Sequence, residues 1–148
     1  MVKGKKLEND VKKYLKMNGD FYHKFTDSFG ARGLTTPVPA DFIIFPPHGR
    51  AILLECKMTQ KIKVPMASFR PSQWKAAKQS LEVESCNYYV IINHNGGYNN
   101  PHNGYYLIHA LEILKSLDNG EKSIDLTNLA KSDTINKVMD FMFGENSE

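Results

Sequence analysis

Two short apolar runs on either side of a five-residue turn constrain this chain most strongly. Residues 42–45 and 51–56 flank the turn Pro46-Pro47-His48-Gly49-Arg50. Apolar runs of this length, bounded by proline and glycine, predict the two antiparallel strands of a hairpin. Because the turn centres on His48, residues equally distant from His48 in sequence are expected to face each other across the hairpin.

Hydrophobic spacing predicts further helices and strands before and after this hairpin. Asp133 is the expected N-cap of the last helix, since aspartate is favoured at that position. These elements predict a mixed α/β fold, with a central β-sheet flanked by helices. We expect one domain over residues 1–148, with the helices from about residue 110 packed on its core. The expected helices are 5–17, 72–84, 110–117 and 133–143, and the further strands are 21–26, 88–92 and 105–108.

Several protein classes do not fit this sequence. No apolar run approaches the roughly 18 residues of a membrane span, and the start does not resemble a signal peptide. Cys56 and Cys86 provide neither a disulfide framework nor paired metal-ligand spacing. The sequence therefore predicts a cytoplasmic protein with no membrane partner. Glycine-rich loops with nucleotide-binding spacing are missing, so no small-molecule cofactor is expected.

Charge is distributed unevenly along the chain. Up to Ser80 there are 15 Lys and Arg against 6 Asp and Glu, and from Leu81 onward there are 4 against 10. The first half is therefore a candidate surface for a polyanion such as DNA. The alternative explanation of this charge distribution is that the lysines only solvate exposed faces of the protein.

Three ionisable residues are expected to meet on the hairpin. Asp41 and Glu55 are both seven residues from His48, so they should lie across from each other. Lys57 follows Glu55 by two residues and projects from the same face of its strand. Two adjacent carboxylates repel unless a cation lies between them, and Mg²⁺ prefers such oxygen ligands. The bound ion would activate water against a phosphodiester, with Lys57 positioning that water or stabilising charge. The alternative is a solvated ion pair between Lys57 and one of the acids.

Glu8 is a further candidate on the first predicted helix. Helical geometry places it close to the apolar stripe that includes Val11 and Leu15, so it should face partly inward toward the metal cluster. The alternative is an ion pair with Lys12, four residues further along the helix.

Two motifs resemble a known nuclease family. Pro39-Ala40-Asp41 followed by Glu55-Cys56-Lys57 resembles the PD-(D/E)xK signature. The segment 65–73, PMASFRPSQ, is similar to the stretch that follows the E-x-K motif in RecU-type Holliday junction resolvases. The segment 21–24, FYHK, is similar to the strand before that family's mobile loop. The resemblance extends from about Lys5 to Ile108.

This resemblance implies a restriction-endonuclease-like (PD-(D/E)xK) core and metal ligation by Asp41 and Glu55. It also implies a catalytic role for Lys57, with Gln73 and Glu8 completing the site. Members of that family act as homodimers that nick two strands of a four-way junction symmetrically, with Mg²⁺ or Mn²⁺. This chain is shorter than the cellular enzymes, and its segment between Lys24 and Asp41, where the family has a protruding stalk, is compact. Residues 28–39 within it, with two glycines and two prolines, are expected to form an irregular loop. A short version rich in lysine and asparagine would fit a phage-encoded enzyme that acts in the host cytoplasm.

The expected DNA contacts are basic residues, most of them near these motifs, each neutralising a phosphate. Two other functions remain open from sequence. One is a nuclease of the same fold that cuts flaps or linear duplex, and the other is a non-catalytic DNA-binding module. The candidate DNA-binding residues are Lys5, Lys6, Lys24, Arg32, Lys61, Lys63, Arg70 and Lys75.

Overall fold

A computed structural model describes residues 3–26 and 38–147 of the chain. Within these residues a six-stranded sheet forms the centre of the fold, and two further strands pair separately, β4 (Lys63–Pro65) with β7 (Ser123–Asp125). The order of the central sheet is β1 (Phe21–Lys24), β2 (Phe42–Phe45), β3 (Ala51–Thr59), β5 (Cys86–His94), β6 (Gly104–His109) and β8 (Lys131–Ser132).

The hairpin of β2 and β3 has the predicted register. Phe42 pairs with Leu54 and Ile44 with Ile52, so the hairpin is centred on His48. Gly49 in the turn has a φ of +96°, and a Cβ there would lie 3.1 Å from the Asn146 side chain. Glycine therefore serves both the backbone conformation and the close approach of the C-terminal helix.

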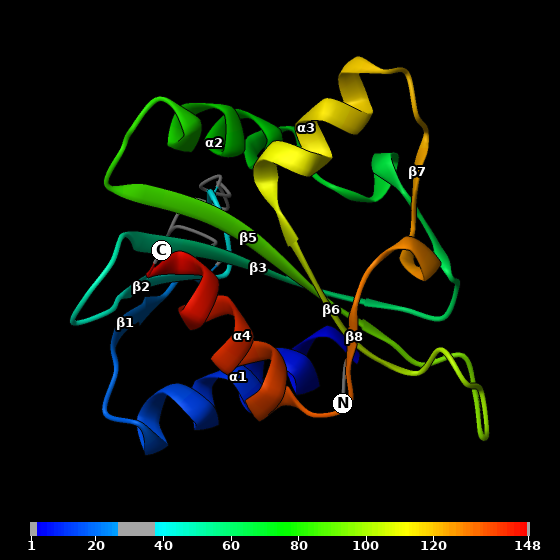
Figure 1. Ribbon diagram of the computed structural model, residues 1–148, viewed down its shortest axis with the longest axis horizontal. Helices are drawn as coiled ribbons and strands as arrows, with labels where there is room; N and C mark the ends of the chain where they lie inside the picture. The colour runs from blue at the N-terminus through cyan, green and yellow to red at the C-terminus, as the bar shows by residue number, and fades with distance from the viewer. Residues whose placement is uncertain (1–2, 27–37, 148) are drawn as a thin grey trace, which may run out of the picture.

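Four helices of the described chain cover the two faces of the sheet (Figure 1). On one face lie α1 (Lys3–Met17) and α4 (Ile135–Asn146), and on the other lie α2 (Pro71–Leu81) and α3 (Ala110–Asp118). The helix α2 connects β3 to β5, which run parallel to each other, while the other neighbouring strands of the sheet are antiparallel. A parallel pair needs such a crossover connection.

Each face of the sheet has its own hydrophobic core. Leu54 and Ile52 belong to the core under α1 and α4, whereas Leu53 packs against the core under α2 and α3. Alternation along β3 therefore sends Glu55 and Lys57 to the α2 side of the sheet and Cys56 to the α1 side. Cys56 packs against the core under α1 and α4, in agreement with this alternation.

The predicted fold class, a mixed α/β sheet flanked by helices, is confirmed, with local differences. The N-cap of α4 is Thr134, whose hydroxyl accepts a hydrogen bond from Lys137 N at 3.2 Å, so the prediction of Asp133 was wrong by one residue. The predicted strand 88–92 extends in both directions as β5. The strands β4, β7 and β8 were not predicted, because two or three residues show no periodicity and their pairing depends on distant partners.

No helix in the described part of the chain combines the length and the apolar character that a membrane crossing requires.

Candidate active site

The carboxyl groups of Asp41 and Glu55 lie side by side on the α2 side of the β2–β3 pair. Asp41 N donates to Leu54 O at 3.0 Å, which extends the hairpin ladder by one residue before the start of β2. Asp41 Oδ2 accepts a hydrogen bond from Cys56 N at 2.8 Å. Each of the two carboxyl groups shifts the pKa of the other, which shows that they are close neighbours. The register predicted from the turn therefore brings the two acids together.

Burial makes this pair of acids electrostatically unusual. Glu55 is only 4% exposed, and burial followed by the charge of Asp41 raises the pKa of Glu55 to about 9. Burial also raises the pKa of Asp41, although the hydrogen bond from Cys56 N opposes this shift. Two such groups cannot both be ionised near neutral pH unless a positive charge compensates them.

Gln73, on the first turn of α2, holds one oxygen of Glu55. Its Nε2 donates to Glu55 Oε2, and its Oε1 accepts from Arg70 N at 2.9 Å. The amide has one orientation because its oxygen must face the Arg70 N–H and its NH₂ group the carboxylate. Gln73 therefore links the beginning of α2 to the acid pair, 18 positions earlier in sequence.

Lys57 lies on the same face of β3 as Glu55. Its Nζ donates to the carbonyl of Ser68 and lies 4.9 Å from the centre of the Phe69 ring. Phe69 in turn packs on Trp74, with 5.0 Å between the ring centres. Burial lowers the pKa of Lys57, and the charge of Glu55 opposes that shift. The ammonium group is thus held beside the carboxylates by the segment before α2, rather than paired with either acid.

Glu8 is half-buried on α1, as its position beside the apolar stripe predicted. Its Oε1 forms an ion pair with Lys24 Nζ at 2.8 Å, instead of the alternative pair with Lys12. Glu8 still acts on the site electrostatically, since its charge contributes to raising the pKa of Asp41. Lys24, a candidate DNA contact, is committed to this pair and also lies 5.8 Å from the centre of the Phe42 ring.

The donors at Asp41 and Glu55 fit a hard divalent cation. Glu55 Oε1 is buried and has no hydrogen-bond partner among the described residues. A buried carboxylate oxygen without a partner is costly, and oxygen is the ligand that Mg²⁺ prefers. Within residues 3–26 and 38–147, no group of three or more His, Cys, Asp or Glu side chains is arranged around a metal position. Asp41 and Glu55 would supply two carboxylates, which matches the few protein ligands that Mg²⁺ commonly takes.

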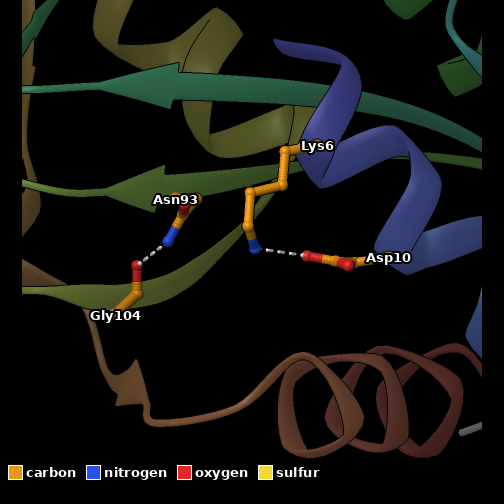
Figure 2. A network of polar contacts seen from close by, with 4 residues as sticks. All are labelled: Lys6, Asp10, Asn93 and Gly104. Atoms are coloured by element: carbon orange, nitrogen blue, oxygen red, sulfur yellow. Dashed lines mark hydrogen bonds and ion pairs between the residues drawn. The ribbon is translucent and has the colours of Figure 1, made fainter. Parts of the chain in front are cut away.

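The other candidate DNA-binding residues differ in their surroundings. Arg70 lies near the acids, since its charge acts to lower the pKa of Glu55. Figure 2 shows Lys6 directed at Asp10, with 3.2 Å between Lys6 Nζ and Asp10 Oδ2. The same view shows that the side-chain amide of Asn93 donates to Gly104 O, a hydrogen bond between β5 and β6. Arg32 lies outside the described residues, as does most of the predicted loop 28–39. The exposed candidates are Lys5, Lys6, Lys61, Lys63, Arg70 and Lys75.

Three groups that surround this site were not predicted from the sequence. The Ser68 carbonyl and the Phe69 ring hold Lys57, and the Tyr88 hydroxyl bonds the Pro39 carbonyl just before Asp41. Phe69 belongs to the segment that resembles the resolvases, but its position there carried no role. Backbone carbonyls and a tyrosine within an apolar strand leave no recognisable pattern in a sequence.

The fold matches that of a nuclease of known structure. The chain is similar to Hjc of Archaeoglobus fulgidus, a Holliday junction resolvase from an archaeal hyperthermophile, with a TM-score of 0.56. The two share 15% sequence identity, and the match covers 86% of this chain and 95% of that one. No protein-family model matches the chain, and no curated protein sequence does. At this identity the likeness establishes the fold and leaves the chemistry to the site.

Proposed function

We propose that this protein is a divalent-cation-dependent endodeoxyribonuclease that resolves four-way (Holliday) DNA junctions by paired, symmetric nicking. The observation that carries the proposal is the pair formed by half-buried Asp41 and buried Glu55, with the Lys57 ammonium on the same sheet face as Glu55. The Hjc-like fold supports the choice of substrate, and the segment 65–73 supports a RecU-like variant of the reaction.

Asp41 and Glu55 would hold Mg²⁺, for which Mn²⁺ could substitute. When bound, such an ion polarises a phosphodiester and makes bound water more acidic. The protein contributes the rest. Gln73 fixes the orientation of the Glu55 carboxylate, and the Asp41 carboxylate is fixed by the N–H of Cys56.

Lys57 would act on the phosphate or on the attacking water. Its ammonium, held by the Ser68 carbonyl, would donate a hydrogen bond where negative charge develops. Arg70, near Glu55, would contact a neighbouring phosphate and set the register of the strand. Glu8 would act through the charge balance of the site while it remains paired with Lys24.

A homodimer would supply the two active sites that paired nicking requires. Asp41 and Glu55 of one copy form one such site, and a second copy would supply the site for the opposite strand. Closed two-fold dimers are the commonest assembly of this kind.

The test is a labelled synthetic four-way junction incubated with Mg²⁺, Mn²⁺ or EDTA. We expect paired symmetric nicks with either cation and none with EDTA. D41N and K57A should lower the nicking rate about 100-fold or more while junction binding is retained. K137A, which changes an exposed lysine of α4 that is not among the candidate DNA contacts, is the matched control and should retain nearly full cleavage.

Wild-type cleavage rates in D41N and K57A would contradict the assignment of the site. Cleavage of flap and linear duplex substrates should be measured in parallel with cleavage of the junction. A preference for the junction indicates a resolvase, and a preference for another substrate indicates a nuclease with a different target. Salt-sensitive binding without any cation-dependent product would instead indicate a non-catalytic DNA-binding module.

A further inference from the structure

The segment that carries Asp41 into the site needs an anchor. Residues Val38–Ala40 lead into β2 without regular secondary structure. Asp41 itself is fixed toward its neighbouring strands, by Leu54 O, by Cys56 N and by Phe25 N, which donates to Asp41 O at 2.8 Å. None of these bonds holds the residues that immediately precede Asp41.

Tyr88 supplies that missing contact from the other side of β3. Its hydroxyl donates to the Pro39 carbonyl at 2.6 Å. Tyr88 lies on β5 opposite Leu53 and is buried in the same core cluster as Ala40. Pro39 has no N–H, so its carbonyl is the backbone hydrogen-bonding group that it can offer to an anchor.

The hydroxyl of Tyr88 remains a donor throughout the working pH range. Burial, followed by the charges of Glu55 and Asp41, raises the pKa of Tyr88 well above its ordinary value. A tyrosinate at this position would face two carboxylates, whereas the neutral hydroxyl bonds a carbonyl.

We propose that Tyr88 is a positioning residue for Asp41: through the Pro39 carbonyl it fixes the carboxylate where it can share a divalent cation with Glu55. The inference rests on the proposed cation site, and it adds a residue to which neither the sequence motifs nor the fold assigned a role. Groups that orient metal ligands typically change metal affinity 10- to 100-fold when they are removed.

Tyr106 provides a matched control for the test. It is buried to the same extent as Tyr88, at 2% exposed, and belongs to the same core cluster. Its hydroxyl also donates to a backbone carbonyl, that of His102, at 2.7 Å. Y88F and Y106F therefore remove the same kind of hydrogen bond, and they differ in whether that bond leads to Asp41.

The experiment is calorimetric titration of the DNA-free protein with MnCl₂, accompanied by urea unfolding of each variant. We expect Y88F to weaken Mn²⁺ binding about 10-fold, while Y106F stays within about twofold of the wild type. Both variants should lose similar stability. P39G loosens the same segment without changing a core residue, so it should also weaken Mn²⁺ binding. If Y88F does not fold, P39G replaces it in the test.

Two outcomes overturn the inference while leaving the proposed function in place. One is Mn²⁺ affinity in Y88F equal to that of the wild type, and the other is equal weakening in Y88F and Y106F. D41N is the reference for the site itself and should abolish Mn²⁺ binding. A wild-type protein that binds no Mn²⁺, or a D41N protein that binds it unchanged, would overturn the proposed cation site and the role of Tyr88 together.

Discussion

At the scale of single residues, the acid pair works against the stability of the metal-free protein. Glu55 is buried, Asp41 is half-buried, and the two carboxyl groups repel each other when both are ionised. Ordinary packing gives no reason to keep two such groups together, and a hydrophobic or amide side chain would fit the same space at lower cost. The arrangement is explained if the repulsion is relieved by a bound cation, and this has consequences for the dependence of stability on pH.

Without divalent cations, the stability of the protein should fall as pH rises. The pKa of Glu55 is about 9 in the folded chain, against an ordinary value of 4.5, so the folded state binds the proton more tightly. The stabilisation from this proton is complete below about pH 4.5 and is lost as pH rises through about 9. Thermal unfolding at a series of pH values in EDTA measures this slope.

Glu55→Gln should flatten the slope, because the amide stays neutral and still accepts from Gln73. At pH 9 in EDTA we expect E55Q to melt above the wild type, by about 2–4 °C for each kcal/mol of repulsion removed. Added Mg²⁺ should raise the melting temperature of the wild type and leave that of E55Q unchanged. A wild-type profile as flat as that of E55Q would contradict the electrostatic description of the pair.

At the scale of elements, the helices are attached to the sheet by buried polar groups as well as by apolar contacts. Asn146, near the end of α4, donates to Arg50 O at 2.8 Å and accepts from Asn87 on β5 at 2.7 Å. Asn87 Oδ1 in turn lies 3.0 Å from Nε2 of His109, whose Nδ1 accepts from Leu111 N. The last turn of α4 is thereby held against the hairpin turn and the start of α3.

Asn146→Ala should destabilise the protein without affecting the acid pair. The substitution leaves the Asn87 amide and the Arg50 carbonyl without their partner, which costs about 1–3 kcal/mol. Urea unfolding measures this loss, and Asn136→Ala on an exposed position of the same helix is the control. Equal stability of the two variants would show that the buried amides contribute nothing to holding α4.

Local sequence patterns predict some elements of this fold and not others. Apolar runs and their periodicity predict the hairpin, the four helices and the strands β5 and β6. The strands β4 and β7 do not, because Lys63 and Asp125 pair across 62 positions of sequence in a sheet of only two short strands. Thr134 rather than Asp133 caps α4 because it adopts the extended conformation just before the first helical residue.

At the scale of the whole molecule, the unequal charge of the two halves predicts how DNA is bound. Several candidate phosphate contacts are exposed, and Lys61 precedes β4 while Lys75 lies on α2. In contrast, Lys137 on α4 belongs to the acidic half of the chain, and its Nζ lies 4.0 Å from Asp133 Oδ2. DNA binding through phosphate contacts should therefore depend on Lys61 and Lys75 and not on Lys137.

We expect junction affinity to fall linearly with salt concentration on logarithmic axes. K61A and K75A should each reduce the steepness of that dependence by about one unit, whereas K137A should leave it unchanged. Fluorescence anisotropy with a catalytically inactive D41N background keeps the junction intact during the titration. An equal effect of all three substitutions would mean that binding follows net charge and uses no particular face.

The sequence by itself determined the mixed fold, the register of the hairpin and the meeting of Asp41 with Glu55 and Lys57. Those features depend on local quantities: a turn length, a two-residue strand period and the alternation of apolar side chains. Only the tertiary structure decided that Gln73 holds Glu55, that Ser68 and Phe69 hold Lys57, that Glu8 pairs with Lys24, and that Tyr88 reaches Pro39. These contacts join residues on different elements, and their geometry is set by how helices and strands pack, which no spacing along the chain encodes.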